Sequence, residues 1–526
     1  MRFTFIVLSL LILAGLGIAS YFVSWLIWFY LLAGPLFLLG CYDIFQKKHA
    51  LLRNFPLIGH GRYLMESLRP KMYQYFIESD LDGRPFSRIL RNIVYQRAKQ
   101  ALDTNPFGTQ FDVYAEGYEW MNHSLAAKHR ETTEAKPRVL IGGPQCKKPY
   151  AASLLNVSAM SFGSLSDRAV RALNKGALKG SFYHNSGEGG LSYYHLQEGG
   201  DIVWQIGTAY FGCRDEQGHF DESLFHEGAC KEQVKMIEIK LSQGAKPGHG
   251  GILPARKNTE EIAEIRKVKP FEDVISPPTH TTFDSPLGLL QFVQKLRDLS
   301  NGKPVGFKLC IGKKVEFLSI CKAVIESGIY PDFITVDGGE GGTGAAPLEF
   351  SNSVGLPLRE GLAFAHDALS GFGIRNKIKL IASGKVITGF HLFRTLALGA
   401  DLCNSARGML LSLGCIQALE CNKNTCPTGI TTQNQALVKG LDVNSKAERV
   451  ACFQAETLES LMQLTAAAGL SNPEAINRSH VYRRVALNRS ERYDAIYPYI
   501  ESGSLLKPDC PDEWIPLMSG LDSSHF

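Results

Sequence analysis

Three cysteines stand close together in the sequence, separated by five and then four residues and followed by Pro427: Cys415, Cys421 and Cys426. Thiolates at such short spacing are typical ligands of iron–sulfur clusters and of zinc. Three thiolates suit a [3Fe-4S] cluster, whereas a [4Fe-4S] cluster needs a fourth cysteine and structural zinc needs a fourth ligand. Zinc stays possible if a distant histidine completes the set, and the candidates are His226, His249 and His280. The spacing predicts a [3Fe-4S] cluster.

A glycine-rich loop is the second sign of chemistry. The sequence after Asp337 reads GGEGGTGAAP, which contains the pattern GxGxxG at Gly339, Gly341 and Gly344. A dinucleotide fingerprint opens a helix, but here a proline follows within a long loop. We therefore expect Asp337, Gly338 and Gly339 to let the backbone approach a ligand, rather than to form a Rossmann site. No phosphate-binding GxxxxGK[ST] motif occurs, so ATP chemistry is unsupported.

The elements that must position these residues follow an alternating pattern from Ala151 onward. Short β-branched or apolar runs alternate with helical stretches, which is typical of a parallel sheet. Eight candidate strands can be counted, over residues 154–162, 181–185, 202–209, 234–241, 304–310, 333–337, 378–383 and 401–405. Eight such strands predict an α/β fold of the (β/α)8 TIM barrel type, in which the carboxyl ends of the strands form the active face.

Composition and charge exclude several classes of protein. Apolar residues make up 45% of the 526 residues and charged residues 20%, so a mainly disordered or fibrous chain is excluded. Lys and Arg total 56 against 51 Asp and Glu, a balance too even to indicate a nucleic-acid-binding protein. The basic excess is local, because residues 46–100 hold eleven Lys or Arg and four Asp or Glu. We expect this basic segment to touch lipid headgroups, with docking of an acidic ferredoxin as the alternative.

An apolar run precedes the basic segment. Residues 3–39 include no charged side chain over 37 positions. One membrane span needs about 20 apolar residues, so this length predicts a hairpin of two transmembrane helices, over 4–20 and 22–40, rather than a cleaved signal peptide. Positive residues flank the run on both sides, which places both ends in the cytoplasm. We expect the protein in the inner, cytoplasmic membrane, with its catalytic domain facing the cytoplasm.

Seven strings in the remaining chain resemble the FMN-binding synthase domain of glutamate synthase. They are SAMSFGSLS (158–166), NSGEGG (185–190), AKPGHGGILP (245–254), ISPPTH (275–280), DGGEGGTGAAP (337–347), SGKVITGFHLFRTLALGAD (383–401) and the cysteine set with NTCPTG. The resemblance covers roughly residues 153–443, and the architecture is similar to the shorter, stand-alone proteins of that family. It implies an FMN-binding barrel with a [3Fe-4S] cluster on three cysteines.

The resemblance also implies roles for individual residues. The FMN phosphate would be held by loops after the last two strands, at Gly384, Lys385, Ser405 and Arg407. The flavin ring would lie near the small side chains that follow the first strand, at Ser158, Ala159, Met160 and Ser161. Lys308 would stabilise negative charge on reduced flavin or bind a substrate carboxylate. Glu188 would contact the substrate, and a simple turn carboxylate is its alternative reading.

Departures from the family bear on the expected reaction. Arg2 and the apolar run follow Met1, where full-length family members carry a glutaminase domain, and about one hundred residues follow the cysteines, too few for the family's β-helical domain. We therefore expect no release of ammonia from glutamine. His249 stands where the family motif AKPGEGG has an acid, and KLCIGKKVEF diverges after the lysine at its start. These two differences leave the identity of the substrate open.

The expected domains are a transmembrane hairpin (1–45), a basic juxtamembrane and lead-in segment (46–150), the barrel with its iron–sulfur loop (151–443) and a C-terminal helical extension (444–526). The expected reaction is the reduction of 2-iminoglutarate, made from 2-oxoglutarate and ammonia, to L-glutamate. Electrons would enter through the cluster from a ferredoxin or a reductase subunit. The alternatives are a flavin-dependent oxidoreductase acting on another small 2-oxo or 2-hydroxy acid, and a non-catalytic membrane electron-transfer subunit.

Overall fold

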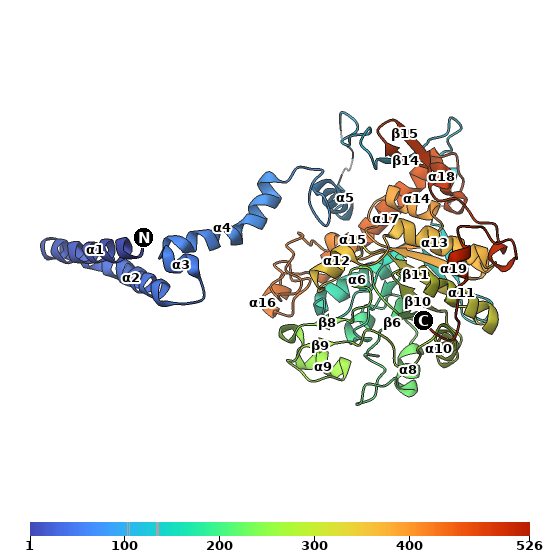
Figure 1. The fold of residues 1–526 in the computed structure, drawn as a ribbon, viewed down its shortest axis with the longest axis horizontal. Coiled ribbons are helices and arrows are strands. Elements are labelled where there is room, and N and C mark those ends of the chain that lie inside the picture. Colours follow the sequence, from blue (N-terminus) through green and yellow to red (C-terminus); the bar gives the residue numbers. More distant parts are fainter. Residues whose placement is uncertain (102–103, 105, 133–135) are drawn as a thin grey trace. The chain divides into compact units, whose positions relative to one another are not determined.

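A computed structural model describes residues 1–101, 104, 106–132 and 136–526, which form two compact units, Met1–Arg88 and Ile89–Phe526 (Figure 1). The predicted lead-in segment 46–150 therefore divides between the two units. Its first part continues the N-terminal helices, and its second part belongs to the unit that contains the barrel.

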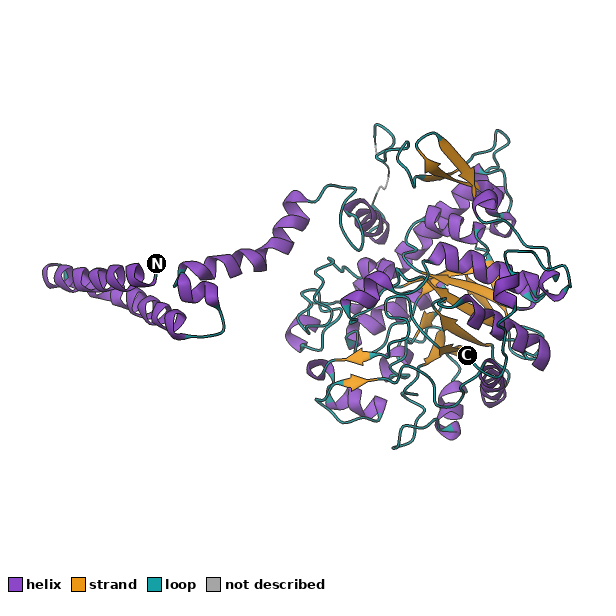
Figure 2. Cartoon of the chain, in the orientation of Figure 1, coloured by secondary structure: helices purple, strands orange, loops and turns teal. Residues whose placement is uncertain are grey.

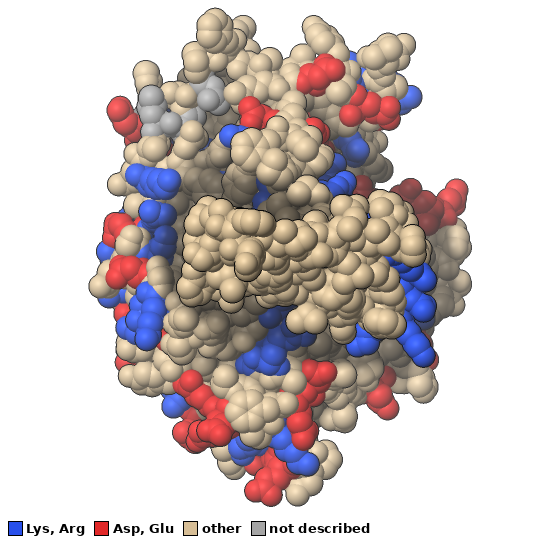
Figure 3. Space-filling model, turned by 90° about the vertical axis from the view of Figure 1, so that its left-hand side faces the viewer, with Lys and Arg blue, Asp and Glu red and all other residues tan. Residues whose placement is uncertain are grey.

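The first unit begins with two apolar helical segments. They are α1 (Arg2–Phe22) and the 3-10 turn η1 (Ser24–Phe29) continued by α2 (Tyr30–Phe45), and by length and composition each is apolar enough to cross a membrane. The hydroxyl of Tyr30 donates to the carbonyl of Leu13 over 2.6 Å and ties the two together. The face of the hairpin that is turned to the viewer in the space-filling view shows no Lys, Arg, Asp or Glu (Figure 3). The predicted helical hairpin is present, and membrane insertion stays a prediction.

Three further helices complete this unit: α3 (Ala50–Asn54), α4 (Ile58–Met72) and the π-helix η2 (Tyr73–Ile77). The buried carboxylate of Asp43 in α2 accepts from the N–H of Leu57 over 3.0 Å and contacts His60 Nε2 at 2.9 Å. Arg2 Nε donates to the carbonyl of Arg53 over 2.7 Å. These contacts fasten α3 and α4 to the start of α1 and the end of α2.

The second unit contains the predicted barrel. Eight parallel strands close in the order β10-β11-β12-β13-β4-β5-β6-β7. They are β4 (Leu155–Val157), β5 (His184–Asn185), β6 (Ile202–Ile206), β7 (Val234–Lys240), β10 (Val305–Leu309), β11 (Phe333–Asp337), β12 (Lys379–Ser383) and β13 (Leu402–Ser405). Each lies inside one of the eight predicted strands, so the TIM barrel is confirmed. The strands are buried on both faces, which explains their apolar sequences.

Helices surround the strands, which form the centre of the unit (Figure 2). The main ones are α6 (Asp167–Gly180), α8 (Glu222–Ala229), α10 (Pro286–Leu299), α11 (Lys314–Ser327), α13 (Leu358–Gly371) and α14 (Gly389–Ala397). Their starts follow from local chemistry: Ser166 Oγ caps α6 by accepting from the N–H of Ala169, and Thr388 caps α14 in the same way. Outside the barrel, the antiparallel strands β2 (Arg138–Ile141) and β3 (Tyr150–Ser153) pair, as do β8 (Ile252–Leu253) and β9 (Val274–Ile275).

The C-terminal extension was expected to be helical, and this expectation is incomplete. It begins with the long helix α17 (Val443–Ala467), which packs on α6 and α14. Two strands follow, β14 (Val481–Ala486) and β15 (Arg489–Arg492), and β14 pairs with β1 (Glu119–Met121) from the lead-in segment. The alternating sequence VYRRVA, followed by the turn at Leu487 and Asn488, supports an antiparallel hairpin rather than a helix.

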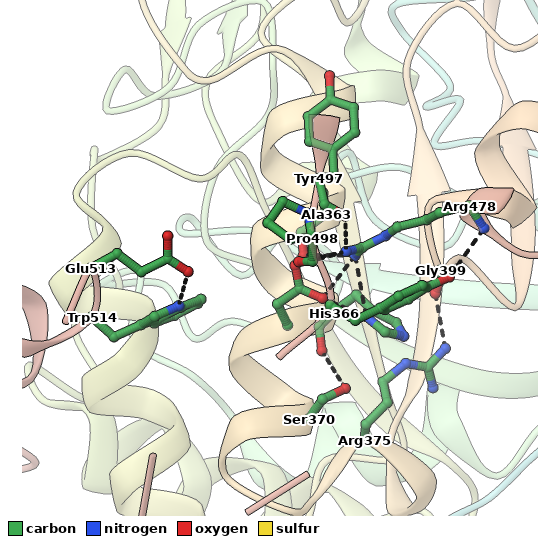
Figure 4. A network of polar contacts seen from close by, with 12 residues as sticks. Ala363, His366, Ser370, Arg375, Gly399, Arg478, Tyr497, Pro498, Glu513 and Trp514 are labelled. Carbon is green, nitrogen blue, oxygen red and sulfur yellow. Dashed lines mark hydrogen bonds and ion pairs between the residues drawn. The ribbon is translucent and has the colours of Figure 1, made fainter. Parts of the chain in front are cut away.

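A buried arginine joins this extension to the barrel. The guanidinium of Arg478 is fully buried and contacts the Asp367 carboxylate of α13 at 2.8 and 3.0 Å. It also donates to the carbonyls of Tyr497 and Pro498, at 2.8 and 3.2 Å, and its side chain points into the group around His366 (Figure 4). This network fixes residues 478–498 on α13.

Candidate active site

The structure brings the predicted flavin and substrate residues to the carboxyl ends of the barrel strands. Lys308 lies on β10, and Asp337 and Ser405 end β11 and β13. Other predicted residues lie in the loops that directly follow: Ser158, Ala159, Met160 and Ser161 after β4, Glu188 after β5, Gly338 and Gly339 after β11, Gly384 and Lys385 after β12, and Arg407 after β13. These positions form one face of the barrel, the face that carries active sites in this fold.

Lys308 is part of a buried ion pair. Its Nζ lies 3.2 Å from Asp337 Oδ2, and the two side chains are 7% and 5% exposed. Asp337 also accepts from the N–H of Gly244 over 3.0 Å. Burial alone would lower the pKa of Lys308, but Asp337, Glu238 and Glu188 outweigh it and raise the pKa above its usual value. Lys308 is therefore a fixed cation at the barrel mouth.

Glu188 is a second charge at the mouth, and its side chain is 20% exposed. Its Oε2 lies 2.7 Å from Nζ of Lys240, the last residue of β7. Burial would raise the pKa of Glu188, but Lys240 and Lys246 outweigh it and hold the pKa below its usual value. The loop after β7 passes against this carboxylate at Gly251, where a β-carbon would lie 2.7 Å from Glu188 Oε1. A larger residue at position 251 would therefore have to displace the Glu188 carboxylate.

Four charged residues of the site were missed by the sequence reasoning. Glu238, inside the barrel on β7, accepts from Asn185 (2.8 Å), Gln205 (2.6 Å) and Thr335 (2.6 Å). Lys240 lies two residues further along the same strand. Lys246 and Arg266 come from the following segment; burial lowers the pKa of Lys246 to about 8 and that of Arg266 to about 10, although Glu188 opposes both shifts. The signal was present for two of them, because Glu238 and Lys240 are charges at alternate positions near the end of a largely apolar strand.

Together these seven side chains are called here the mouth charges: Lys240, Lys246, Lys308, Arg266, Glu188, Glu238 and Asp337. Each is buried or nearly so, and electrostatic interactions link them into one group. Four are cations and three are carboxylates, so the group carries one positive charge in excess. Such an excess in a buried site favours an anionic ligand.

The neighbouring strand ends fit a flavin. Small side chains line the ends of β4 and β12, where Ser158 Oγ lies 3.5 Å from Ser383 Oγ. A β-carbon on Gly187 would lie 2.8 Å from the N–H nitrogen of Ser161, so only glycine lets the β5 loop lie against the β4 loop. Gly384 adopts a φ of +149°, which glycine tolerates best. Arg407 donates to the carbonyl of Glu340 over 2.6 Å and places a buried cation between the β11 and β13 loops.

The cysteine loop follows α15 (Arg407–Ser412). Tyr95 of α5 (Arg88–Ala98) donates to the carbonyl of Cys415 over 2.6 Å. Burial raises the pKa of the Cys415 thiol to about 12, and Cys421 and Cys426 add to this rise, so both lie close enough to Cys415 to affect it. However, no group of three His, Cys, Asp or Glu side chains within the described part of the chain is arranged to hold a metal ion. The donor types fit an iron–sulfur cluster, but their arrangement here does not form a ligand set.

The three histidines considered as additional zinc ligands have other partners. His226 Nδ1 contacts the carbonyl of Leu299 at 2.7 Å, and His249 Nδ1 contacts the carbonyl of Gly250 at 2.9 Å. His280 Nε2 contacts the carbonyl of Lys240 at 2.9 Å. Their contacts give no support to a zinc site at the cysteines.

Comparisons with known proteins agree with this geometry. A sequence profile described as the conserved region in glutamate synthase matches residues 95–471. The glutamate synthase large subunit-like protein YerD of Bacillus subtilis is 38% identical over 478 residues, which cover 84% of this chain and 90% of that protein. The archaeal glutamate synthase (NADPH) of Methanocaldococcus jannaschii is 33% identical over 338 residues, covering 64% of this chain and 63% of that protein. The glutamate synthase (NADPH) large chain of Bacillus subtilis is 32% identical, and the matched part is 21% of its length.

Proposed function

Because the chain belongs to the glutamate synthase family, we propose that it is a flavin-dependent oxidoreductase that reduces 2-iminoglutarate, formed from 2-oxoglutarate and ammonia, to L-glutamate. The observation that carries this proposal is the group of mouth charges beside strand ends that carry small side chains and glycines. The chain spans 63% of the archaeal relative and 21% of the large chain. We therefore propose, for this protein, the activity that those two relatives are named for.

The mouth charges suit a dicarboxylate. Their excess positive charge attracts an anion, and the cations come from different segments, so two carboxylates of one substrate can be bound at separate points. Glu188 and Asp337 hold Lys240 and Lys308 in place before a substrate arrives. This preorganisation lowers the free energy needed to orient the charged groups during the reaction.

Bound FMN would supply the hydride chemistry, and it would be held by Gly384, Lys385, Ser405 and Arg407 on one side and by residues 158–161 on the other. Lys308 Nζ, a permanent cation, stabilises negative charge that develops at the site. Lys246 has a different part, because its pKa of about 8 lets its Nζ gain or lose a proton near neutral pH. The conversion of an oxo acid and ammonia to an imine needs such proton transfers.

The test uses full-length protein purified anaerobically in detergent. Flavin analysis is followed by turnover of 2-oxoglutarate with ammonium under dithionite, scored by the glutamate formed. FMN together with glutamate production is the expected result, and replacing dithionite by reduced ferredoxin or NADPH then identifies the donor class. Bound FMN without glutamate formation would contradict the proposed substrate while leaving the flavin assignment intact.

A second candidate, reduction of another small 2-oxo acid, is favoured by one observation. His249 stands where the family motif has an acid, and its half-buried ring lies 5.2 Å from the ring of Phe350, measured between ring centres. It precedes Gly251, which lies against the Glu188 carboxylate, by two residues in the sequence. Histidine there removes a negative charge from the mouth. A panel of 2-oxo acids with reduced protein separates the two candidates, since the preferred substrate should show the highest kcat/KM.

We also propose that Cys415, Cys421 and Cys426 bind a [3Fe-4S] cluster. The support is their spacing and their place in one loop after α15. Anaerobic protein should contain about three irons per chain. The variant Cys421→Ser should lose this iron, whereas Cys510→Ser, outside the loop, should keep it. Equal iron content in both variants and the parent would contradict the assignment.

The N-terminal hairpin is proposed to anchor the protein in the cytoplasmic membrane, with the barrel on the cytoplasmic side. The support is the length of the two apolar helices and the absence of charged residues from 3 to 39. Protein expressed in bacteria should stay in the membrane fraction after an alkaline carbonate wash. Its complete release by that wash would contradict a transmembrane hairpin.

A further inference from the structure

A cavity of about 360 Å³ lies next to the barrel mouth. Its wall is formed by the residues that follow Lys240 on β7 and Lys308 on β10, by the loop 278–284, by the start of α11 and by Phe526. None of the mouth charges and none of the flavin residues lines it. We call it the side cavity. Its volume is at the small end of the range for ligand sites, about 300 to 1,000 Å³.

The side cavity has an apolar interior. Six of its lining residues are large apolar side chains that are buried or half-buried: Leu241, Phe283, Leu309, Ile311, Phe317 and Ile320. The ring of Phe526, half exposed, lies at the edge of the cavity (Figure 1). The last residues contact α10 through the bond from the Leu287 N–H to the Ser523 carbonyl (3.0 Å), and α11 through the bond from the Asp522 N–H to Ser319 Oγ (3.2 Å). The cavity therefore already borders one aromatic ring, and its interior favours an apolar group of similar size.

The rim of the side cavity is charged with both signs. Lys313 and Glu316 lie 3.4 Å apart, and the Lys313 side chain is 83% exposed, so it can turn toward a ligand. Asp284, also on the rim, is exposed and has no ion-pair partner in the described part of the chain. An ammonium group can therefore meet Asp284 or Glu316, while a carboxylate meets Lys313.

We propose that the side cavity binds a free α-amino acid with an apolar side chain. The zwitterionic head matches the two signs of charge on the rim, and the side chain matches the interior formed by Phe283, Phe317 and Ile320. This binding site goes beyond the proposed glutamate synthesis, because L-glutamate would place a second carboxylate against apolar residues.

The side cavity is connected to the mouth through backbone contacts. His280, which lines the cavity, contacts the carbonyl of Lys240 at 2.9 Å. The N–H of Leu241, another lining residue, donates to the carbonyl of Lys308 over 2.9 Å. A bound amino acid thus contacts residues that position two of the cations in the mouth, so the site is placed to regulate them.

The experiment measures binding to the full-length protein in detergent by titration calorimetry and thermal shift. L-Phenylalanine and L-leucine are the probes. Phenethylamine and 3-phenylpropionate each lack one charge, and L-glutamate lacks the apolar side chain. Saturable binding of the two probes, at least tenfold tighter than that of the three comparison compounds, is expected. The absence of saturable binding by both probes up to about 10 mM, or equal binding of all five compounds, overturns the proposal.

Variants locate the binding. Gly312 lines the cavity, its φ is not in the left-handed region, and a β-carbon there would meet no atom within 4 Å, so Gly312→Trp can fill the cavity without backbone strain. We expect this variant to weaken binding at least tenfold, and Lys313→Gln to weaken it about three- to tenfold. Lys314→Gln, at the neighbouring position outside the lining, should bind like the parent.

Binding that survives Gly312→Trp would place the ligand elsewhere and overturn the proposal. Because these measurements do not use turnover, a failure here is distinguishable from a failure of the proposed synthase activity.

Discussion

Two kinds of buried ion pair occur in the barrel unit, and they differ in how completely their charges are matched. Away from the mouth, Asp332 contacts Arg297 at 3.1 Å and accepts from the N–H groups of Val305 (2.7 Å) and Gly143 (2.6 Å). Arg478 and Asp367 form a similar closed network. At the mouth, by contrast, a single carboxylate, Glu188, faces Lys240, Lys246 and Arg266.

This difference in charge matching indicates which buried charges can bind a ligand. A closed pair has one opposite charge for each charge, so it stabilises the fold and leaves no charge over for a ligand. An open group has one cation more than it has carboxylates, so binding of an anion stabilises it. Closed pairs should therefore affect stability when they are altered, and open groups should mainly affect function.

The largest effect is expected for a closed pair. Arg478→Met leaves the buried Asp367 carboxylate without its guanidinium, and we expect the free energy of unfolding to fall by about 3–5 kcal/mol. Denaturant unfolding of the flavin-loaded protein measures this loss. The fraction that stays folded should turn over substrate normally, because no mouth residue is touched. A small loss of stability with a large loss of turnover would break the comparison.

At the mouth, Lys308→Met should lower kcat by about 100- to 1,000-fold, because it removes a preorganised cation from the reacting group. Removal of one partner also leaves Asp337 buried and unpaired, so some loss of stability is expected. The double variant Lys308→Met, Asp337→Asn separates the two effects, since it should regain stability but not turnover. Recovery of turnover in the double variant, or unchanged turnover in the single one, would contradict a direct role for Lys308.

A smaller, pH-dependent effect is expected at Lys246. Its folded pKa of about 8 lies below its ordinary value of 10.5, so between these values the unfolded chain binds more protons than the folded one. Stability contributed by this group therefore rises as pH increases from about 8 to 10.5, and below pH 8 the full desolvation penalty applies. Lys246→Met should be more stable than the parent at pH 7 by about 1–3 kcal/mol, with the gain shrinking above pH 8.

The measurement compares the free energy of unfolding of the parent and of Lys246→Met from pH 7 to pH 10. Other lysines with a lowered pKa contribute equally in both proteins, so their contribution cancels in the difference. Lys257 and Lys303 serve as that background, since burial also lowers the pKa of each to about 8. A gain that stays constant over the whole pH range would show that Lys246 is not the titrating group.

The sequence predicted the strands that position the site better than it predicted the charged side chains of the site. All eight strands were predictable because parallel strands buried on both faces read as short apolar runs, and Lys308 and Asp337 could be placed at strand ends from that pattern alone. The sequence did not predict that Lys246 and Arg266 lie at the mouth, because they come from a loop and a helix whose path no local sequence pattern specifies. Glu119 shows the same limit, since its partners Arg359 and Arg394 lie more than 200 residues away along the chain.

The smallest effect on stability is expected for a partly exposed ion pair. Arg130 forms a two-point contact with Glu459 of α17, at 3.0 and 2.7 Å, and so resembles the Arg478–Asp367 pair in geometry. Its side chains, however, are 27% and 40% exposed, so water solvates both charges when the pair is broken. Arg130→Gln should therefore lower the free energy of unfolding by less than about 1 kcal/mol and leave turnover unchanged.

The control is the double variant Arg130→Gln, Glu459→Gln, which should be no less stable than the sum of the two single variants predicts. A loss as large as that of Arg478→Met would mean that the geometry of the contact, rather than its burial, decides what a closed pair contributes. In that case the mouth charges could no longer be recognised by their burial and surplus alone, and each pair would have to be tested separately.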